Sequence, residues 1–229
     1  MRLAKNQADF GLFTNDLQAC LAFWQTQVGA GLDHVLPIAP GHDQHRHDVL
    51  GSVLKINHVV EALPDCPPTG YRELLIARAG LSQPQRLTDP NGVLVTLVPQ
   101  GYRGIDQTAI RINVRDLAAH RRFYGRALGL PEENATSTGA AYRAGQSLIF
   151  LEESLDAPVD ASVHGQGWRY ITFQVHKVVE EHSRVLEVAG NEGLPPQILG
   201  ATAKYSMVRD PDGNWIELSQ RASIVGSLD

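Results

Sequence analysis

The residue with the clearest chemical potential is Glu217, which lies in the stretch DPDGNWIELSQ at positions 210–220. The first four residues are typical of a tight turn, because Pro211 presets one backbone dihedral and Gly213 tolerates the positive φ that closes the turn. The residues after the turn alternate in polarity, which predicts a strand with one face on a core and the other on a cavity or solvent. Glu217 falls on the polar face, where a carboxylate can accept a hydrogen bond, take a proton or bind a metal.

Two further predicted strands, 109–114 (AIRINV) and 170–175 (YITFQV), also alternate between apolar and polar residues. The candidate ligand-binding residues on the polar faces of the three strands are Arg111, Asn113, Tyr170, Thr172, Gln174 and Trp215. Because binding pockets combine aromatic walls with a few placed polar groups, we expect these side chains to converge on one concave surface. Arg111 would hold an anionic or carbonyl oxygen, while Tyr170 and Trp215 would pack on a planar ring. The alternative is that the polar faces simply contact solvent.

A second segment with metal-binding chemistry is the histidine-rich stretch GHDQHRHD at positions 41–48. If this segment is extended, His45 and His47 lie on one face, as chelating imidazoles do in some sites. The segment is polar and lacks a strand pattern before Val49, so a loop with solvated imidazoles, able to act as a lid, is the competing interpretation. His120 and His182 recur at the spacing of a helix core, which favours structural roles.

The composition limits the classes of function. The 229 residues are 43% hydrophobic and 20% charged, with a net charge of −5, as in an ordinary soluble globular protein. No run of Lys or Arg favours nucleic acid or an anionic membrane, and no apolar run reaches the roughly 20 residues of a membrane span. Cys20 and Cys66 provide no disulfide framework. We therefore expect a cytoplasmic enzyme or binding protein.

The elements that position these residues recur along the chain, which indicates internal repetition. A predicted strand at 9–14 is followed by an Asp16 cap and a helical pattern that ends at Gly29. The same strand–helix unit starts again near positions 109 and 170, and the turn before Glu217 has a counterpart in DPNG at 89–92. The polar stretch 100–106 is the expected boundary between the two halves.

The helix end FYGRALGL at 123–130, together with the closing strand DPDGNWIEL, resembles the vicinal oxygen chelate superfamily, which includes glyoxalase I, bleomycin-resistance proteins and extradiol dioxygenases. The resemblance implies an α+β fold of tandem βαβββ modules. Residues 107–220 would form a C-terminal module pair and residues 221–229 a tail. Residues 1–100 would form an N-terminal pair, shortened because no helical pattern separates Ala77 from Asp89.

In this superfamily, metal ligands come from the first and closing strands of the modules. The positions that this resemblance assigns are Asp9, Thr96, Ala109, Tyr170 and Glu217, with Glu152 or Glu153 as a less certain addition. Only Glu217 matches clearly, and a catalytic divalent metal needs about three protein ligands. We therefore expect no cofactor at this place. The alternative is iron, manganese or zinc held by rearranged ligands, with His45 and His47 as further candidates.

Three functions remain open on this basis. The first is a small-molecule-binding protein, or a metal-free enzyme with Glu217 as base, whose planar or aromatic ligand lies in a cup of the C-terminal half. The second is a metal-dependent ring-cleaving dioxygenase or glyoxalase-like lyase. The third is a non-catalytic scaffold that binds a partner. The chain would be a monomer with internal pseudo-symmetry or a homodimer.

Overall fold

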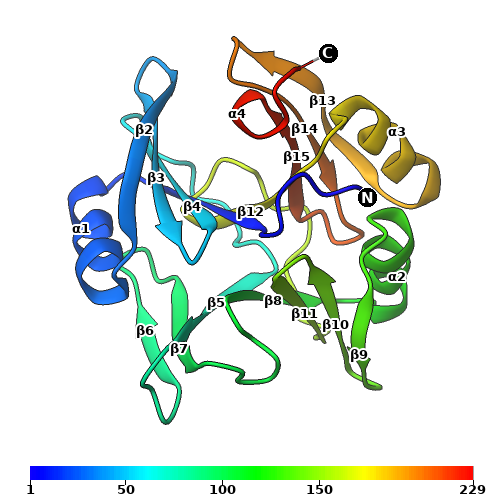
Figure 1. Ribbon diagram of the computed structural model, residues 1–229, viewed down its shortest axis with the longest axis horizontal. Helices are drawn as coiled ribbons and strands as arrows, with labels where there is room; N and C mark the ends of the chain where they lie inside the picture. Colours follow the sequence, from blue (N-terminus) through cyan, green and yellow to red (C-terminus); the bar gives the residue numbers. More distant parts are fainter. Residues whose placement is uncertain (229) are drawn as a thin grey trace.

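The computed structural model describes residues 1–228, and the strands among them form two mixed sheets (Figure 1). The upper sheet consists of β1 (Asp9–Thr14), β2 (Gly31–Ala39), β3 (His42–Val49), β4 (Ser52–Val59), β12 (Gly167–Gln174), β13 (Asn191–Leu199), β14 (Ala203–Arg209) and β15 (Trp215–Arg221). The lower sheet consists of β5 (Tyr71–Arg78), β6 (Gln85–Thr88), β7 (Leu94–Pro99), β8 (Thr108–Val114), β9 (Glu132–Ala135), β10 (Gly139–Ala144) and β11 (Ser147–Glu153).

Helices follow the first strands of three modules. These are α1 (Leu17–Ala22) with its π-helical continuation η1 (Phe23–Val28), α2 (Leu117–Arg121) with η2 (Arg122–Ala127), and α3 (Val178–Val188); a short α4 (Ala222–Val225) lies near the C-terminus. The predicted caps are confirmed, because the Asp16 and Asp116 carboxylates accept hydrogen bonds from the backbone N–H groups of Ala19 and Ala119 at 3.1 and 2.9 Å. In the described part of the chain, no helix has the length and apolar character needed to cross a membrane.

The element order confirms the predicted α+β fold of repeated modules. The first, third and fourth modules each run strand, helix and three strands, beginning at β1, β8 and β12. The second module is β5-β6-β7, with no helix in residues 79–84. The gap that the sequence shows between Ala77 and Asp89 therefore corresponds to a missing helix and strand.

The sheets form across the two halves of the chain. β1 pairs antiparallel with β12, so the first and fourth modules share the upper sheet. β5 pairs antiparallel with β8, so the second and third modules share the lower sheet. The expectation of one cup built from the C-terminal half is therefore wrong, because β8 lies in a different sheet from β12 and β15.

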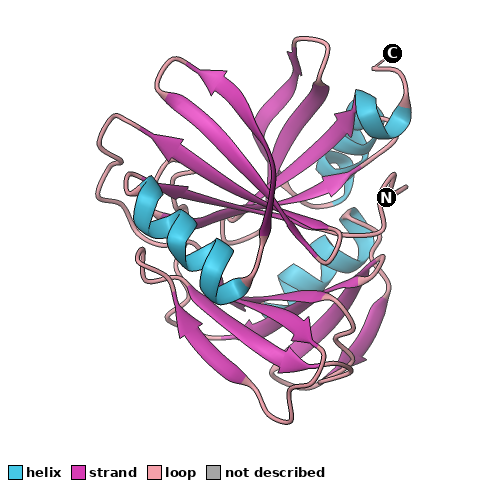
Figure 2. Ribbon diagram, turned by 60° about the vertical axis from the view of Figure 1, so that its left-hand side comes forward, coloured by secondary structure: helices cyan, strands magenta, loops and turns pink. Residues whose placement is uncertain are grey.

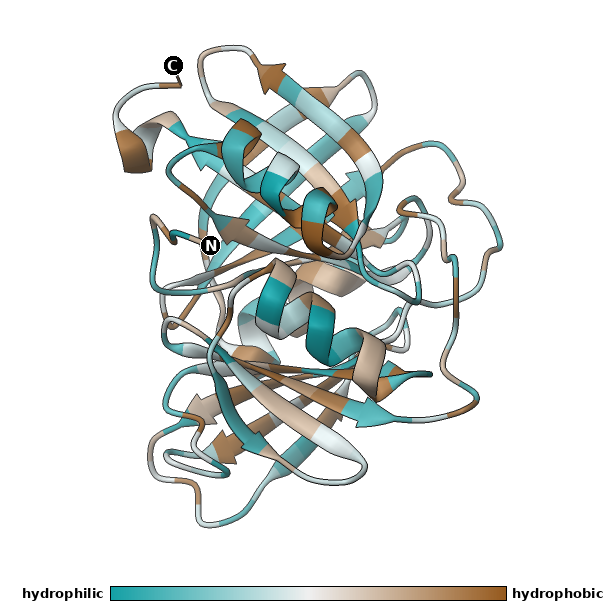
Figure 3. Cartoon of the chain, turned by 90° about the vertical axis from the view of Figure 1, so that its right-hand side faces the viewer, coloured by the Kyte–Doolittle hydropathy of each residue, from teal (hydrophilic) through white to brown (hydrophobic). Residues whose placement is uncertain are grey.

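The two sheets turn their apolar faces toward each other. One buried cluster contains Phe10, Leu54 and Ile216 from the upper sheet together with Leu74 and Ile112 from the lower sheet. Figure 2 shows the two strand layers with helices packed beside and between them, and Figure 3 shows the apolar segments on the layers from the side. The opposite faces of the sheets consequently point away from this shared core.

Candidate functional site

The outward face of the upper sheet encloses a cavity of about 350 Å³. This volume is near the lower end of the roughly 300–1,000 Å³ found for ligand sites. Its polar and aromatic lining includes Arg46, Lys55, Asn57, Tyr170, Trp215 and Glu217. These residues come from the first and fourth modules, so the cavity depends on the pairing of distant parts of the chain.

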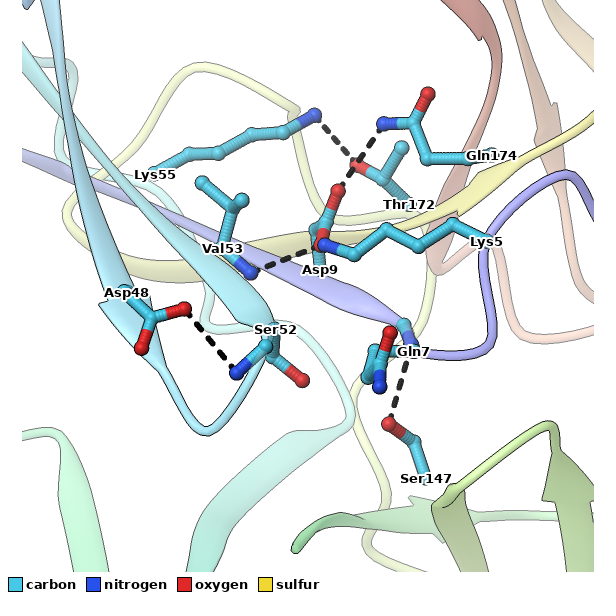
Figure 4. Close-up of polar contacts among 12 residues, drawn as sticks. Lys5, Gln7, Asp9, Asp48, Ser52, Val53, Lys55, Ser147, Thr172 and Gln174 are labelled. Carbon is cyan, nitrogen blue, oxygen red and sulfur yellow. Dashed lines mark hydrogen bonds and ion pairs between the residues drawn. The ribbon is translucent and has the colours of Figure 1, made fainter. Parts of the chain in front are cut away.

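An ion pair forms the floor of the cavity. The Nζ atom of Lys55 lies 2.7 Å from Oε2 of Glu217. The same atom donates to Oγ1 of Thr172 at 2.7 Å (Figure 4). The Thr172 hydroxyl in turn donates to Glu217 Oε2 at 2.9 Å. The Lys55 side chain is only 3% exposed, and burial lowers its pKa, an effect that the Glu217 carboxylate opposes.

Asp9 lies beside this floor and is fully buried. Its carboxylate forms an ion pair with Lys5 and accepts hydrogen bonds from the Val53 backbone N–H at 2.8 Å and the Gln174 side-chain amide at 3.0 Å (Figure 4). Both oxygens are therefore engaged in structural contacts.

Tyr170 forms part of the aromatic wall. Its hydroxyl accepts hydrogen bonds from the amides of Asn57 and Gln44 at 3.1 and 3.3 Å, and burial raises its pKa well above the ordinary value. The ring lies directly over Gly11, where an added Cβ would be 2.2 Å from it. Gly11 is therefore required for this placement, and Tyr170 is a neutral phenol.

The predicted turn at 210–213 sets the start of β15. The Asp210 carboxylate accepts hydrogen bonds from the backbone N–H groups of Asp212 and Asn214 at 3.1 and 2.8 Å, and Gly213 has a φ of 84°. Trp215 and Glu217 then alternate with the buried Ile216 and place their side chains in the cavity. The predicted turn and strand polarity are confirmed.

The register of the upper sheet relates Glu217 to Lys55. Asp9 lies opposite Thr172 and Gly11 opposite Tyr170, so a pseudo-twofold axis exchanges Asp9 with Tyr170 and Gly11 with Thr172. Lys55 lies beside Gly11 on β4, as Glu217 lies beside Thr172 on β15. Lys55 is therefore the counterpart of Glu217. The assignment of Thr96 to this role is wrong, because Thr96 lies in the lower sheet and donates to Glu73.

The four symmetry-related positions do not fit a divalent metal. They hold Asp9, Lys55, Tyr170 and Glu217, of which one is an ammonium and one a neutral phenol. About three ligands are needed for a catalytic metal, and the Lys55 ammonium already contacts the Glu217 carboxylate. Among residues 1–228, no group of three or more His, Cys, Asp or Glu side chains is arranged to hold a metal ion.

The structure brings together only some of the predicted binding residues. Tyr170, Gln174 and Trp215 line the cavity with Glu217, and Thr172 lies buried beneath them. Arg111 and Asn113 are on β8 in the lower sheet, so their predicted placement beside Glu217 is wrong. Arg111 is held there by the carboxylates of Glu73 and Glu152, and cannot clamp a ligand in the upper cavity.

The histidine-rich segment is strand β3, not a loop or lid. His45 and His47 do share a face, opposite Ile56 and Leu54 of β4, but that face points to the core side of the sheet. His47 is fully buried, with Nε2 3.1 Å from the Gln25 amide. The alternating residues His42, Gln44 and Arg46 line the cavity instead.

Sequence reasoning missed Lys55, Asn57, Gln44, Arg46 and Arg221, which all line the cavity. Two of them were detectable, because Lys55 and Asn57 alternate with the apolar Leu54 and Ile56 as in a strand with one buried face. Gln44 and Arg46 were not, since their segment is polar on both faces. The missing information was which strands share a sheet.

The lower sheet carries a larger depression, of about 680 Å³, over β9–β11. Its lining includes Leu148 and Phe150, which belong to a buried apolar cluster with Ala109. Charged groups in the lining form ion pairs, Arg143 with Glu133 and Glu152 with Arg111, and Arg103 lies over the Phe150 ring. We therefore assign the candidate site to the upper sheet.

Comparisons with known proteins agree with this fold. The family description "Glyoxalase/Bleomycin resistance protein/Dioxygenase superfamily" matches residues 104–218. Glyoxalase I from Zea mays is similar in structure, with a TM-score of 0.74 and 15% identity over 97% of this chain and 95% of that one. A candidate dioxygenase from Bacillus subtilis has a TM-score of 0.70 and 11% identity over 96% and 85% of the two chains. No curated protein sequence matches the chain.

Proposed function

The chain belongs to the Glyoxalase/Bleomycin resistance protein/Dioxygenase superfamily, and from this premise we propose that it binds a small planar molecule in the upper cavity without a divalent metal. The cavity has the size of a small organic ligand, and its walls carry aromatic rings at defined positions. The fold is compatible with metal-free binding, because a fold alone does not determine the chemistry of the site it carries.

The observation that carries the proposal is the Lys55–Glu217 ion pair. A catalytic metal centre needs about three protein ligands, and the four symmetry-related positions hold only two carboxylates, because one position is Lys55 and another is the phenol of Tyr170. The Lys55 ammonium supplies the positive charge that Glu217 needs in a buried setting. The pair therefore takes the electrostatic role that a cation would have.

The aromatic residues support a planar ligand. Phe13, Tyr170 and Met207 form a small apolar cluster with Trp215 packed against it, separate from the main core. The Trp215 ring is fixed by a hydrogen bond from its Nε1 to the Ala161 carbonyl at 2.8 Å and by Arg209, 5.1 Å from the ring centre. Fixed rings of this kind bind flat molecules at a low entropic cost.

Metal content of untagged protein tests the proposal, with Glu217→Ala as the comparison. We expect no stoichiometric iron, manganese or zinc in either form, and saturable binding of a planar neutral probe such as 2-naphthamide. Stoichiometric metal that disappears in Glu217→Ala would contradict the proposal and favour the dioxygenase or lyase alternative. Absence of binding by any planar probe would favour the partner-binding scaffold.

A metal-free proton transfer is the second candidate, and the environment of Lys55 favours it. Burial lowers the pKa of its ammonium, and Glu217 lies 2.7 Å away, so the pair can exchange a proton with a bound ligand. Deuterium exchange into a bound carbon acid, followed by NMR in wild type and Glu217→Gln, tests this candidate. Exchange that persists unchanged in Glu217→Gln would contradict it.

A further inference from the structure

Arg46 is a buried cation without a carboxylate partner among the described residues. Its side chain projects from β3 into the cavity, and the residue is only 4% exposed. Its guanidinium donates to the neutral Gln44 amide oxygen, and its Nε has no hydrogen-bond partner. A buried guanidinium is costly unless an anion or several acceptors satisfy it.

Arg221 brings a second guanidinium to the same wall. It leaves the end of β15 and reaches toward β2, with its Nη2 3.5 Å from Nε2 of His34. His34 lies opposite Arg46 in the β2–β3 pairing. The two arginines therefore lie near each other in the cavity, although β12, β1 and β4 separate their strands in the sheet. In the described part of the chain, no carboxylate lies within 4 Å of either guanidinium.

The charges at the cavity do not balance. Lys55 and Glu217 neutralise each other, and Asp9 is paired with Lys5. Arg46 and Arg221 are left as the surplus, opposed only at longer range by Glu217, Asp9 and Asp33. Desolvation and the nearby Arg46 charge both lower the pKa of Arg221, which is the expected cost of placing two cations together.

We propose that the ligand of this cavity carries an oxyanion, a carboxylate or a phosphate, which is bound between Arg46 and Arg221 while its planar body packs on Tyr170 and Trp215. This inference rests on the proposed function and specifies the chemical class of the ligand. Guanidinium groups suit either oxyanion, because their N–H donors match the spacing of its oxygens. The Gln44 amide already donates to Asn57 and Tyr170, and the Gln174 amide donates to Asp9, so the two guanidinium groups provide the donors for the oxyanion.

Isothermal titration with three matched probes tests the inference: 2-naphthoate, the uncharged 2-naphthamide, and 2-naphthyl phosphate. Because hydrogen bonds to charged groups are stronger than those to neutral groups, we expect the tighter of the two anions to bind at least about tenfold more tightly than the amide. Whichever anion binds more tightly identifies the headgroup as carboxylate or phosphate.

Variants assign the effect to the two arginines. Arg46→Gln and Arg221→Gln should each reduce the affinity for the anion by about tenfold or more and the affinity for 2-naphthamide by much less, so that the preference for the anion falls. Arg143→Gln in the lower sheet, where Arg143 pairs with Glu133, is the control and should change neither. If Arg46→Gln fails to fold, Arg221→Gln still decides the question, because its side chain is less buried.

The outcomes separate the inference from the function on which it rests. Equal binding of the amide and both anions, or an anion preference that survives in both variants, would overturn the oxyanion inference and leave planar-ligand binding intact. Failure of all three probes to bind wild type would overturn both.

Discussion

At the scale of single residues, Lys55 determines what Glu217 can do. A carboxylate on the polar face of a strand can bind a metal, act as a base or accept a hydrogen bond, and the sequence around Glu217 is compatible with each. The Lys55 ammonium lies 2.7 Å from the carboxylate and forms an ion pair with it, which disfavours metal binding. The chemistry of Glu217 is therefore set by a residue 162 positions away in the chain.

Removing the ammonium should destabilise the fold. We expect Lys55→Met to lower the free energy of unfolding by about 2–4 kcal/mol, because it leaves a mostly buried carboxylate without its partner. The double variant Lys55→Met/Glu217→Gln should recover part of this loss, since no unpaired charge remains. Urea denaturation at neutral pH measures both effects. An unchanged midpoint in Lys55→Met would show that the ion pair contributes nothing.

The residue scale also shows what the sequence could predict. Trp215 and Glu217 were found because a turn fixes the start of their strand and alternation fixes their face, and Tyr170 was found by alternation alone. Arg111 shares the same pattern but lies elsewhere, because alternation says which face a residue takes and not which sheet it belongs to. Lys55 required the pairing of β4 with β1.

At the scale of elements, the close contact between β1 and β12 positions the aromatic wall. Gly11 has no side chain, and the Tyr170 ring occupies the space where one would be. Strand β3 was not predicted from the sequence, because both of its faces are polar. One face points toward the cavity and the other toward Gln25. Its cross-strand pairing with β4 fixes the conformation.

Adding one methyl group at Gly11 should therefore disturb the site. We expect Gly11→Ala to cost about 1–3 kcal/mol of stability and to weaken 2-naphthamide binding, because Tyr170 must move into the cavity. Gly31→Ala is the matched control, since no atom lies within 4 Å of the added Cβ, and should stay within about 0.5 kcal/mol of wild type. Thermal unfolding and titration measure the two effects. Equal behaviour of the two variants would contradict the packing argument.

Helix α2 is joined to the turn before β15 by His120. Its ring is fully buried, with Nδ1 2.7 Å from the Asp116 carbonyl and Nε2 3.4 and 3.6 Å from the carboxylates of Asp210 and Asp212. The contacts of Nε2 are at ion-pair distance without forming a hydrogen bond. Burial acts to lower the pKa of His120, but Asp210, the Asp116 carbonyl and Asp212 together outweigh it, and the pKa is raised.

This raised pKa predicts how stability depends on pH. Because the folded pKa exceeds the unfolded value of about 6.5, the stabilisation from His120 is complete below that pH and is lost as the pH rises through the folded pKa. The difference in unfolding free energy between wild type and His120→Gln should therefore shrink from about pH 6 to pH 9. Urea titrations across this range measure it. A difference that grows with pH would contradict the ion-pair assignment.

At the scale of the whole molecule, the repeat predicted from the sequence is confirmed. The modules pair across the two halves of the chain, the first with the fourth and the second with the third. The modules and the fold could be predicted because each strand–helix unit has local signals in caps and turns. The assembly of the first module with the fourth could not, because no local signal specifies which edges meet. The division at 100–106, the cytoplasmic location and the oligomeric state remain predictions.

The cross-half pairing makes the two halves interdependent. We expect separately produced fragments 1–103 and 104–229 to lack binding of 2-naphthamide, because β1 and β4 come from one and β12 and β15 from the other. Co-expression of the fragments should restore binding, since each supplies its strands to both sheets. Binding by fragment 104–229 alone would show that the C-terminal half forms a complete cup.

The most direct test of the account is a calorimetric titration of untagged wild-type protein with 2-naphthamide, carried out once in EDTA and once with added zinc, iron or manganese. We predict saturable one-to-one binding with the same affinity in both conditions, because the Lys55–Glu217 pair makes a metal unnecessary at the floor of the cavity. Binding that appears only with an added metal and disappears in EDTA would contradict the central claim.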